Sequence, residues 1–124
     1  MTWYAAHLVI GIMPIQKSAE TILVHENVVL VEASSESDAL GKAEAIGLTE
    51  ANLQDGMTMD GVPAKRLFAG IRKLITVSNP ETNNLDQDRP SDGTEITYSV
   101  YKVSNEEELK KLATGLEVQV KYIE

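Results

Sequence analysis

The stretch that decides the fold covers residues 3–13 and reads WYAAHLVIGIM. Apolar side chains recur there at every second position (Tyr4, Ala6, Leu8, Ile10 and Ile12). Because alternate residues of a strand point to opposite faces, this pattern predicts a strand with one buried face. Pro14 ends the run, and a polar QKSAE connection leads to a second β-branched run at residues 21–33. The two runs predict a long hairpin.

The residues after the hairpin predict a short helix over residues 36–46. Ser35 is a good N-cap, and acidic residues follow it in the first turn, where the helix dipole is positive. Gly47 suits the end of the helix. One helical face collects the apolar side chains that would pack on the sheet (Ala39, Leu40, Ala43 and Ile46).

Turn-forming residues and the alternation of apolar and polar side chains predict the remaining elements. Two Asp-Gly pairs, at residues 55–56 and 60–61, predict an irregular excursion over residues 48–64. Residues 65–78 and 94–103 predict the third and fourth strands. Ser104 and Glu107 form a capping box that starts a second helix, with Gly115 near its end. Residues 117–123 predict a last strand with Val118, Val120 and Tyr122 on one side.

This order, β-β-α-β-β-α-β, predicts one α+β domain over residues 1–124. We expect an antiparallel sheet of about five strands with both helices on one face. Without the first strand the order is that of a ferredoxin-like sandwich, whose own first strand is flanked on both sides. Either the N-terminal strand takes the place of the last strand, or the strand order differs.

Composition narrows the class of function. A net charge of −8, from 19 acidic and 11 basic residues, argues against binding to nucleic acid or to anionic lipid. The chain has no cysteine, so it has no thiolate nucleophile and no cysteine-based metal site. The apolar N-terminus has no basic region or cleavage site and is too short to span a bilayer, which favours a cytoplasmic protein.

Four segments resemble a small bacterial family, the domain of unknown function family four-two-eight-eight. They are WYAAHL, ENVVLVEASSESDALGKAEAIG, RLFAGIRKL and DGTEITYS, which start at residues 3, 26, 66 and 92. The resemblance covers residues 3–101, and the helix and strand over residues 104–124 look like an extension. It implies a small α+β domain and carries no activity.

The acidic stretch DQDRPSDGTE, residues 86–95, is the first candidate for a cation site. An EF-hand loop needs oxygen ligands at regular alternate positions and a bidentate Glu at its end. Arg89 and Pro90 interrupt that pattern, and Glu95 follows Gly93 too soon. We interpret the stretch as a polar loop in which Asp92 and Gly93 form the turn into the next strand.

The two histidines are the natural general bases. If the first hairpin closes about Ser18, His7 faces Val29 and His25 faces Gly11. The two rings would then share a face about 13 Å apart, which is too far for one metal ion. We therefore expect neither a metal ion nor a cofactor.

Glu26 is the best candidate for a functional carboxylate. It shares the parity of Ile22, Val24, Val28 and Leu30, which predicts a buried face where a carboxylate needs a partner. Arg66 or Arg72 from the third strand could supply that partner. A β-bulge could instead turn Glu26 outward, and either a structural ion pair or a bulge is favoured over catalysis. The site candidates are Glu26, His25, Arg66 and Arg72.

The sequence favours a non-enzymatic binding or assembly module, since no convergent set of reactive groups is visible. Two alternatives stay open: an acidic, immunity-type antagonist of a basic protein, and an enzyme or enzyme subunit that uses Glu26. We also expect a homodimer, because a well-patterned last strand needs an edge to pair with. Its contact would include the last strand or the first one (candidates Trp3, Val118, Val120 and Tyr122).

Overall fold

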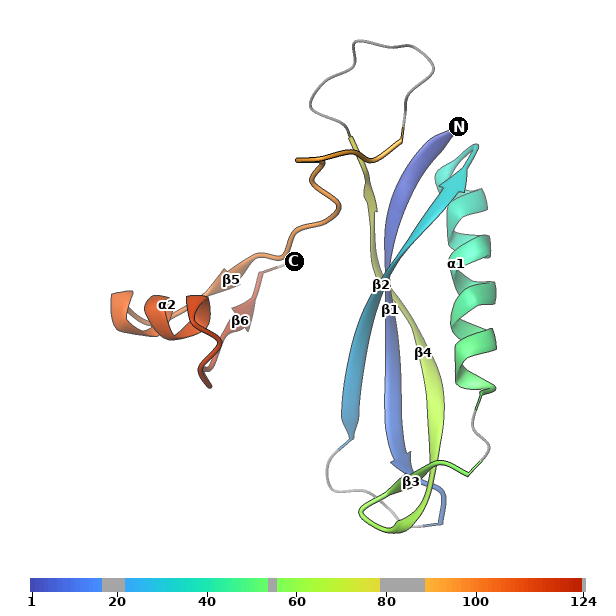
Figure 1. Ribbon diagram of the computed structural model, residues 1–124, viewed down its shortest axis with the longest axis vertical. Coiled ribbons are helices and arrows are strands. Elements are labelled where there is room, and N and C mark those ends of the chain that lie inside the picture. Colours follow the sequence, from blue (N-terminus) through green and yellow to red (C-terminus); the bar gives the residue numbers. More distant parts are fainter. Residues whose placement is uncertain (17–21, 54–55, 79–88, 124) are drawn as a thin grey trace.

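The structure is a computed structural model that describes residues 1–16, 22–53, 56–78 and 89–123. Its elements are β1 (Thr2–Pro14), β2 (Leu23–Ala33), α1 (Glu36–Ala51), β3 (Thr58–Met59), β4 (Val62–Thr76), β5 (Tyr101–Lys102), α2 (Glu106–Ala113) and β6 (Lys121–Tyr122). Four strands form an antiparallel sheet in the order β2-β1-β4-β3, and β5 pairs with β6 separately. We call residues 97–123 the C-terminal arm. Figure 1 shows α1 along one side of the large sheet and the arm projecting from the other.

β1 lies in the middle of the large sheet, between β2 and β4. Its predicted buried parity is confirmed, because every side chain of that set is at most 8% exposed. On this face Tyr4 packs with Ala39 of α1, and Ala6 and Leu8 pack with Ala43. The core of the domain therefore lies between β1 and α1.

α1 begins where the sequence predicted but ends later. Ser35 Oγ accepts a hydrogen bond from the Asp38 amide at 3.1 Å, as an N-cap should. The helix continues past Ile46 to Ala51, and Gly47 lies inside it. A Cβ at Gly47 would lie 2.5 Å from Phe68 Cε1 of β4. Gly47 thus permits close helix–sheet packing and does not end the helix.

Small residues at every fourth position make this close approach possible along the whole helix. They are the buried positions of α1 (Ala39, Ala43, Gly47 and Ala51). Leu40 was predicted on the packed face and is 42% exposed, because the buried stripe follows the small residues.

Most of the described part of the predicted excursion over residues 48–64 is regular structure, while Asp55 of the first predicted Asp-Gly turn lies outside the described residues. Its first part completes α1, and its second part is a tight hairpin of β3 and β4. Asp60 and Gly61 have φ angles of 52° and 81°, and two consecutive positive values are what a type I′ hairpin turn requires.

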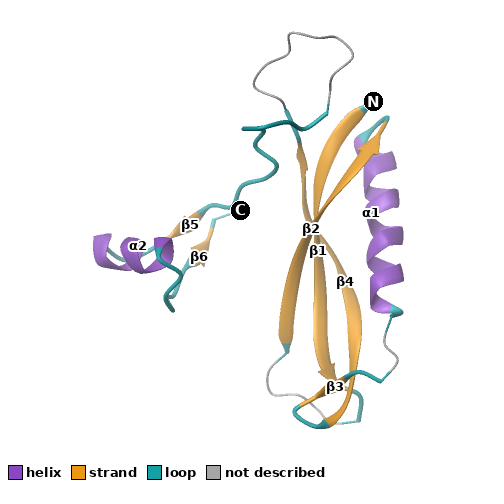
Figure 2. Ribbon diagram, in the orientation of Figure 1, coloured by secondary structure: helices purple, strands orange, loops and turns teal. Residues whose placement is uncertain are grey.

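The strand order does not confirm the ferredoxin-like prediction. β1 is inserted between β2 and β4, and the strand predicted over residues 94–103 pairs regularly only at Tyr101 and Lys102. Glu95 adds a single bridge to Ser78. The prediction that both helices share one face is wrong, since α1 and α2 lie on opposite sides of the sheet (Figures 1 and 2). The last strand pairs with β5 and adds nothing to the large sheet.

The register of the first hairpin differs from the prediction by one residue. His25 pairs with Ile10 and His7 pairs with Val28. A shift of one residue moves a side chain to the other face of a strand, so the two histidines lie on opposite faces of the sheet. The prediction that their rings share a face is wrong.

Candidate functional site

A connected group of polar side chains surrounds His7, on the face of the sheet opposite to α1. His7 is 2% exposed. Its Nδ1 lies 2.6 Å from Glu26 Oε2, and its Nε2 lies 2.6 Å from Thr97 Oγ1. Arg72 donates to both oxygens of Glu26, from Nε at 2.9 Å and from Nη2 at 3.0 Å. These four residues, the His7 cluster, connect β1, β2 and β4 to the C-terminal arm.

A β-bulge in β4 brings Arg72 to this face. His7 pairs with Lys73, whereas the next residue, Leu8, pairs with Ile71, so Arg72 is the extra residue. Ile71 packs in the core, and Arg72 and Lys73 both reach the arm. Lys73 Nζ donates to the Tyr98 carbonyl, and the Arg72 guanidinium lies 4.7 Å from the centre of the Tyr122 ring.

The pKa values of Glu26 and of the neighbouring Tyr122 shift in opposite directions. Hydrogen bonds from Arg72 hold the pKa of Glu26 below its ordinary value; partial burial opposes this effect, and His7 adds to it. Partial burial, followed by the neighbouring Tyr101, raises the pKa of the Tyr122 phenol above 10.0. Glu26 is therefore a paired anion at neutral pH.

Of the two partners predicted for Glu26, the structure selects Arg72. The expectation that Glu26 shares a buried face is wrong, because Val24, Val28 and Leu30 are 40–56% exposed. The buried parity of β2 contains Val31 and Ala33, which face α1. Sequence reasoning missed His7 and Thr97 as members of this site.

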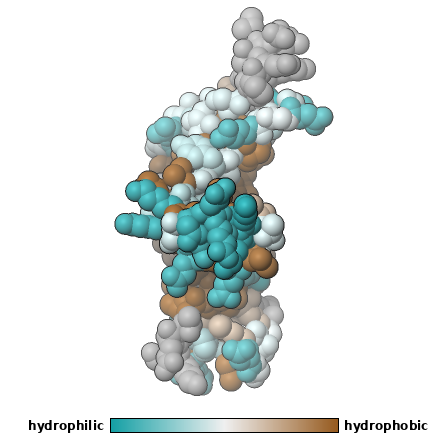
Figure 3. All heavy atoms as spheres, turned by 90° about the vertical axis from the view of Figure 1, so that its left-hand side faces the viewer, coloured by the Kyte–Doolittle hydropathy of each residue, from teal (hydrophilic) through white to brown (hydrophobic). Residues whose placement is uncertain are grey.

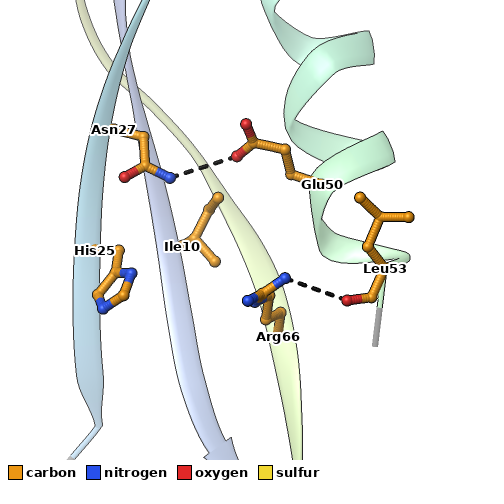
Figure 4. Close-up of a pocket in the computed structure, with 6 residues that line it drawn as sticks. All are labelled: Ile10, His25, Asn27, Glu50, Leu53 and Arg66. Atoms are coloured by element: carbon orange, nitrogen blue, oxygen red, sulfur yellow. Dashed lines mark hydrogen bonds between the residues drawn. The ribbon is translucent and has the colours of Figure 1, made fainter. Parts of the chain in front are cut away.

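The other two site candidates meet on the α1 side of the sheet. His25 and Arg66 line a pocket of about 300 Å³ below the C-terminal end of α1, together with four further residues (Ile10, Asn27, Glu50 and Leu53). Figure 4 shows Glu50 and Asn27 toward the top of this pocket and His25 and Arg66 below them, with Ile10 between. Asn27 Nδ2 donates to Glu50 Oε2 at 3.4 Å, and Arg66 Nη1 donates to the Leu53 carbonyl at 3.2 Å.

The predicted interface residues lie in different surroundings. Both edges of β1 are paired, and the buried indole nitrogen of Trp3 has no hydrogen-bond partner in the described part of the chain. In the arm, Val118 and Val120 are half-buried, and Tyr122 is exposed and stacks edge-on with Tyr101 at 5.0 Å. Figure 3 views the side that carries the arm, where hydrophobic atoms are exposed around a hydrophilic centre.

The acidic stretch is described only in part, since residues 86–88 lie outside the described residues. Its second half is the predicted turn: the Thr94 amide donates to the Ser91 carbonyl at 3.0 Å, and Gly93 has a φ of 86°. Within the described ranges, no three His, Asp or Glu side chains gather as they would around a metal ion.

Fold and site together define a small α+β domain with a four-stranded antiparallel sheet and a buried His–Glu–Arg network. The family model named Domain of unknown function (DUF4288) matches residues 3–96, so the chain belongs to this family. The match includes three members of the His7 cluster and ends one residue before Thr97. No curated protein and no solved structure gave a significant match. In the described chain, no helix is both long and apolar enough to cross a membrane.

Proposed function

We propose that this protein is a non-enzymatic assembly module that forms a homodimer through the edge of β2. The proposal rests on one observation: the outer edge of β2 is unpaired among the described residues and carries exposed apolar side chains. β2 is a strand of 11 residues that pairs with β1 on one side and, among the described residues, with nothing on the other. Four of its apolar residues are 40–56% exposed (Leu23, Val24, Val28 and Leu30).

The sequence of β2 lacks three features that protect many natural edge strands: lysine, proline and a bulge. These features prevent pairing with another chain. β2 reads LVHENVVLVEA, with neither lysine nor proline, and pairs with β1 in unbroken register. The carboxylate of Glu26 is turned into the His7 cluster. Such an edge favours the addition of another strand.

A second copy fits this edge because the strand is complementary to itself. In an antiparallel pair with its two-fold axis at Asn27, Val24 lies opposite Leu30 of the other copy, and Glu26 lies opposite Val28. An axis at Glu26 or at Val29 would set carboxylates against each other, which destabilises a strand pair. An axis at Asn27 gives a closed, isologous contact.

A charge exchange tests this pairing. Val24→Lys places lysine against Leu30 of the other copy twice per dimer, so light scattering should report the mass of a monomer, 13.6 kDa. Adding Leu30→Glu to that variant sets the new carboxylate against the new lysine and should restore the dimer. Leu40→Lys, at a similarly exposed position on α1, is the control and should stay dimeric. A wild-type chain that is monomeric at all concentrations would refute the proposal.

A second candidate function rests on the order of groups in the His7 cluster. Hydroxyl, imidazole and carboxylate follow one another from Thr97 through His7 to Glu26, which is the order of a nucleophile, a base and an orienting acid. The His7 side chain is 3% exposed and the carboxylate is already paired with Arg72, which favours a structural role. Hydrolysis of an activated ester that survives in Thr97→Ser and is lost in Thr97→Val would support the enzyme instead.

A further inference from the structure

The C-terminal arm lies on the His7 cluster without burying any of its own residues. Residues 97–123 are all half-buried or exposed, and Leu109 and Leu116 stay 53% and 61% exposed. His7, on the sheet, is by contrast 2% exposed. A segment that buries little apolar surface gains little free energy from packing. We therefore expect the arm to open more readily than the sheet unfolds.

The arm contacts the sheet as a short bound peptide would. Thr97 Oγ1 lies 2.6 Å from His7 Nε2. The carbonyl of the next residue, Tyr98, accepts a hydrogen bond from Lys73 Nζ, which also lies 5.3 Å from the centre of the Tyr98 ring. Two consecutive residues thus present a hydroxyl, a carbonyl and an aromatic ring to one face of the sheet.

Apolar side chains beside the cluster stay exposed on the same face. Alternate residues of a strand point to the same side, so Val24, Val28 and Leu30 share the face of Glu26. They are 56%, 41% and 40% exposed. Figure 3 shows hydrophobic atoms around the hydrophilic arm on this side of the molecule. The face therefore offers polar contacts next to apolar surface that the arm leaves exposed.

The contacts on the sheet and the segment that covers them differ in their relation to the family. The family model matches residues 3–96, a range that includes His7, Glu26 and Lys73 and none of the arm. The groups that receive the arm therefore lie within the family domain, and the residues that cover them lie outside the match.

We infer that this face binds a peptide segment of a partner protein in which serine or threonine precedes an aromatic residue, followed by apolar residues. Thr97 and Tyr98 occupy the site as an intramolecular competitor, and the partner binds when the arm opens. The apolar residues of the partner would pack on Val24, Val28 and Leu30. The inference goes beyond the proposed dimer, because the dimer uses the edge of β2 and this site uses its face.

Fluorescence anisotropy with a labelled peptide, TEITYSVYKV from residues 94–103, tests the site on the full chain. The apparent affinity falls with the fraction of chains whose arm is open. Thr97→Val in the chain removes the hydroxyl beside His7 and leaves the sheet unchanged, so it should bind the peptide at least about tenfold more tightly than wild type. Ser99→Ala, at an exposed position of the arm, is the control and should bind like wild type. Equal affinities of Thr97→Val and wild type would overturn the inference.

A second peptide tests whether the hydroxyl binds at His7. Valine in place of the threonine at position 97 of the peptide should weaken its binding to the Thr97→Val chain at least about tenfold. Tyr122→Ala, which removes the ring beside the Arg72 guanidinium, gives a second chain with a loosened arm. The two peptides should rank in the same order on it. Equal affinities of the two peptides, or no binding at millimolar concentration, would refute the inference.

Two further measurements complete the test. Circular dichroism shows whether the variants are folded: if Thr97→Val is not, Tyr122→Ala decides, and unfolding of both would contradict an arm that opens from a folded sheet. An apparent affinity that falls as the chain concentration rises would assign the site to the arm of a second copy and overturn the inference. Light scattering without peptide reports the dimer, so the two proposals fail independently.

Discussion

Glu26 is the residue on which the contact between the sheet and the arm depends. Its carboxylate accepts two hydrogen bonds from Arg72 and lies 2.6 Å from His7 Nδ1. Glu26→Gln removes the charge and weakens the hydrogen bonds to the buried His7 imidazole and the partly buried Arg72 guanidinium, so it should destabilise the fold by about 1–3 kcal/mol. Urea unfolding at neutral pH measures the loss. Glu32→Gln on the same strand is the control, and equal losses from both variants would contradict this account.

The stabilisation from Glu26 should also depend on pH. The folded state lowers the pKa of Glu26 from 4.5, so its contribution is fully present above that pH and is lost as the pH falls through the folded pKa. The difference in unfolding free energy between wild type and Glu26→Gln should therefore shrink below pH 4.5. Urea titrations from neutral to acid pH measure this difference. A constant difference over the range would show that the Glu26 charge is not involved.

Two glycines of α1 should respond to alanine in opposite directions. Gly47→Ala puts a Cβ 2.5 Å from the Phe68 ring and should destabilise the fold by about 1–3 kcal/mol through overpacking. A Cβ at Gly41 meets nothing within 4 Å, so Gly41→Ala should stabilise the fold by about 0.5–1 kcal/mol through helix propensity. Thermal unfolding measures both, and a stabilised Gly47→Ala variant would contradict the packing of α1 on β4.

At the scale of elements, the start of α2 provides a test of capping. Ser104 was predicted as the N-cap, but the side chain of Asn105 accepts the hydrogen bond from the Glu108 amide, at 2.9 Å. Asn105→Ala should therefore destabilise α2 by about 1 kcal/mol, and Ser104→Ala should change little. Hydrogen exchange of the amides of α2 measures the effect. Faster exchange in Ser104→Ala alone would restore the predicted cap.

Elements whose pattern has a local cause could be predicted from the sequence. The alternation of residues 3–13 and the Ser35 cap were sufficient to locate β1 and the start of α1. The hairpin register was not, because β2 has apolar residues on both parities and a shift of one residue leaves its pattern almost unchanged. Gly47 misled the prediction since a glycine required for tertiary packing resembles one that ends a helix.

The candidate sites could be predicted only in part, because their residues are brought together by tertiary contacts that no local sequence pattern shows. The sequence named Glu26 and Arg72 but did not distinguish Arg72 from Arg66 as the partner of Glu26. The reason is that the bulge that turns Arg72 toward Glu26 forms only when β4 pairs with β1. His7 looked like an ordinary residue of a strand, and Thr97 comes from a segment 90 residues further along the chain. Glu50 gave one usable signal, an acidic residue near a helix end without basic neighbours.

At the scale of the whole molecule, two surfaces are left uncovered by the described residues: the outer edge of β2 and the exposed apolar residues of the arm. Leu109 and Leu116 are 53% and 61% exposed, and no residue of α2 is buried. Assembly through β2 would cover part of the apolar surface beside the arm. A role as antagonist of a basic protein stays a prediction, and it is based on the net charge of −8.

The most direct measurement of the β2 pairing is a distance between two spin labels. The chain has no cysteine, so Glu32→Cys offers a unique attachment site on β2. With the two-fold axis at Asn27, positions 32 of the two copies lie about ten residues apart along the paired strands, about 33 Å at 3.3 Å per residue. Pulsed electron paramagnetic resonance on the full chain should give a single distance close to that value. A distance far outside it, or no dipolar coupling at all, would contradict the assembly of this protein through β2.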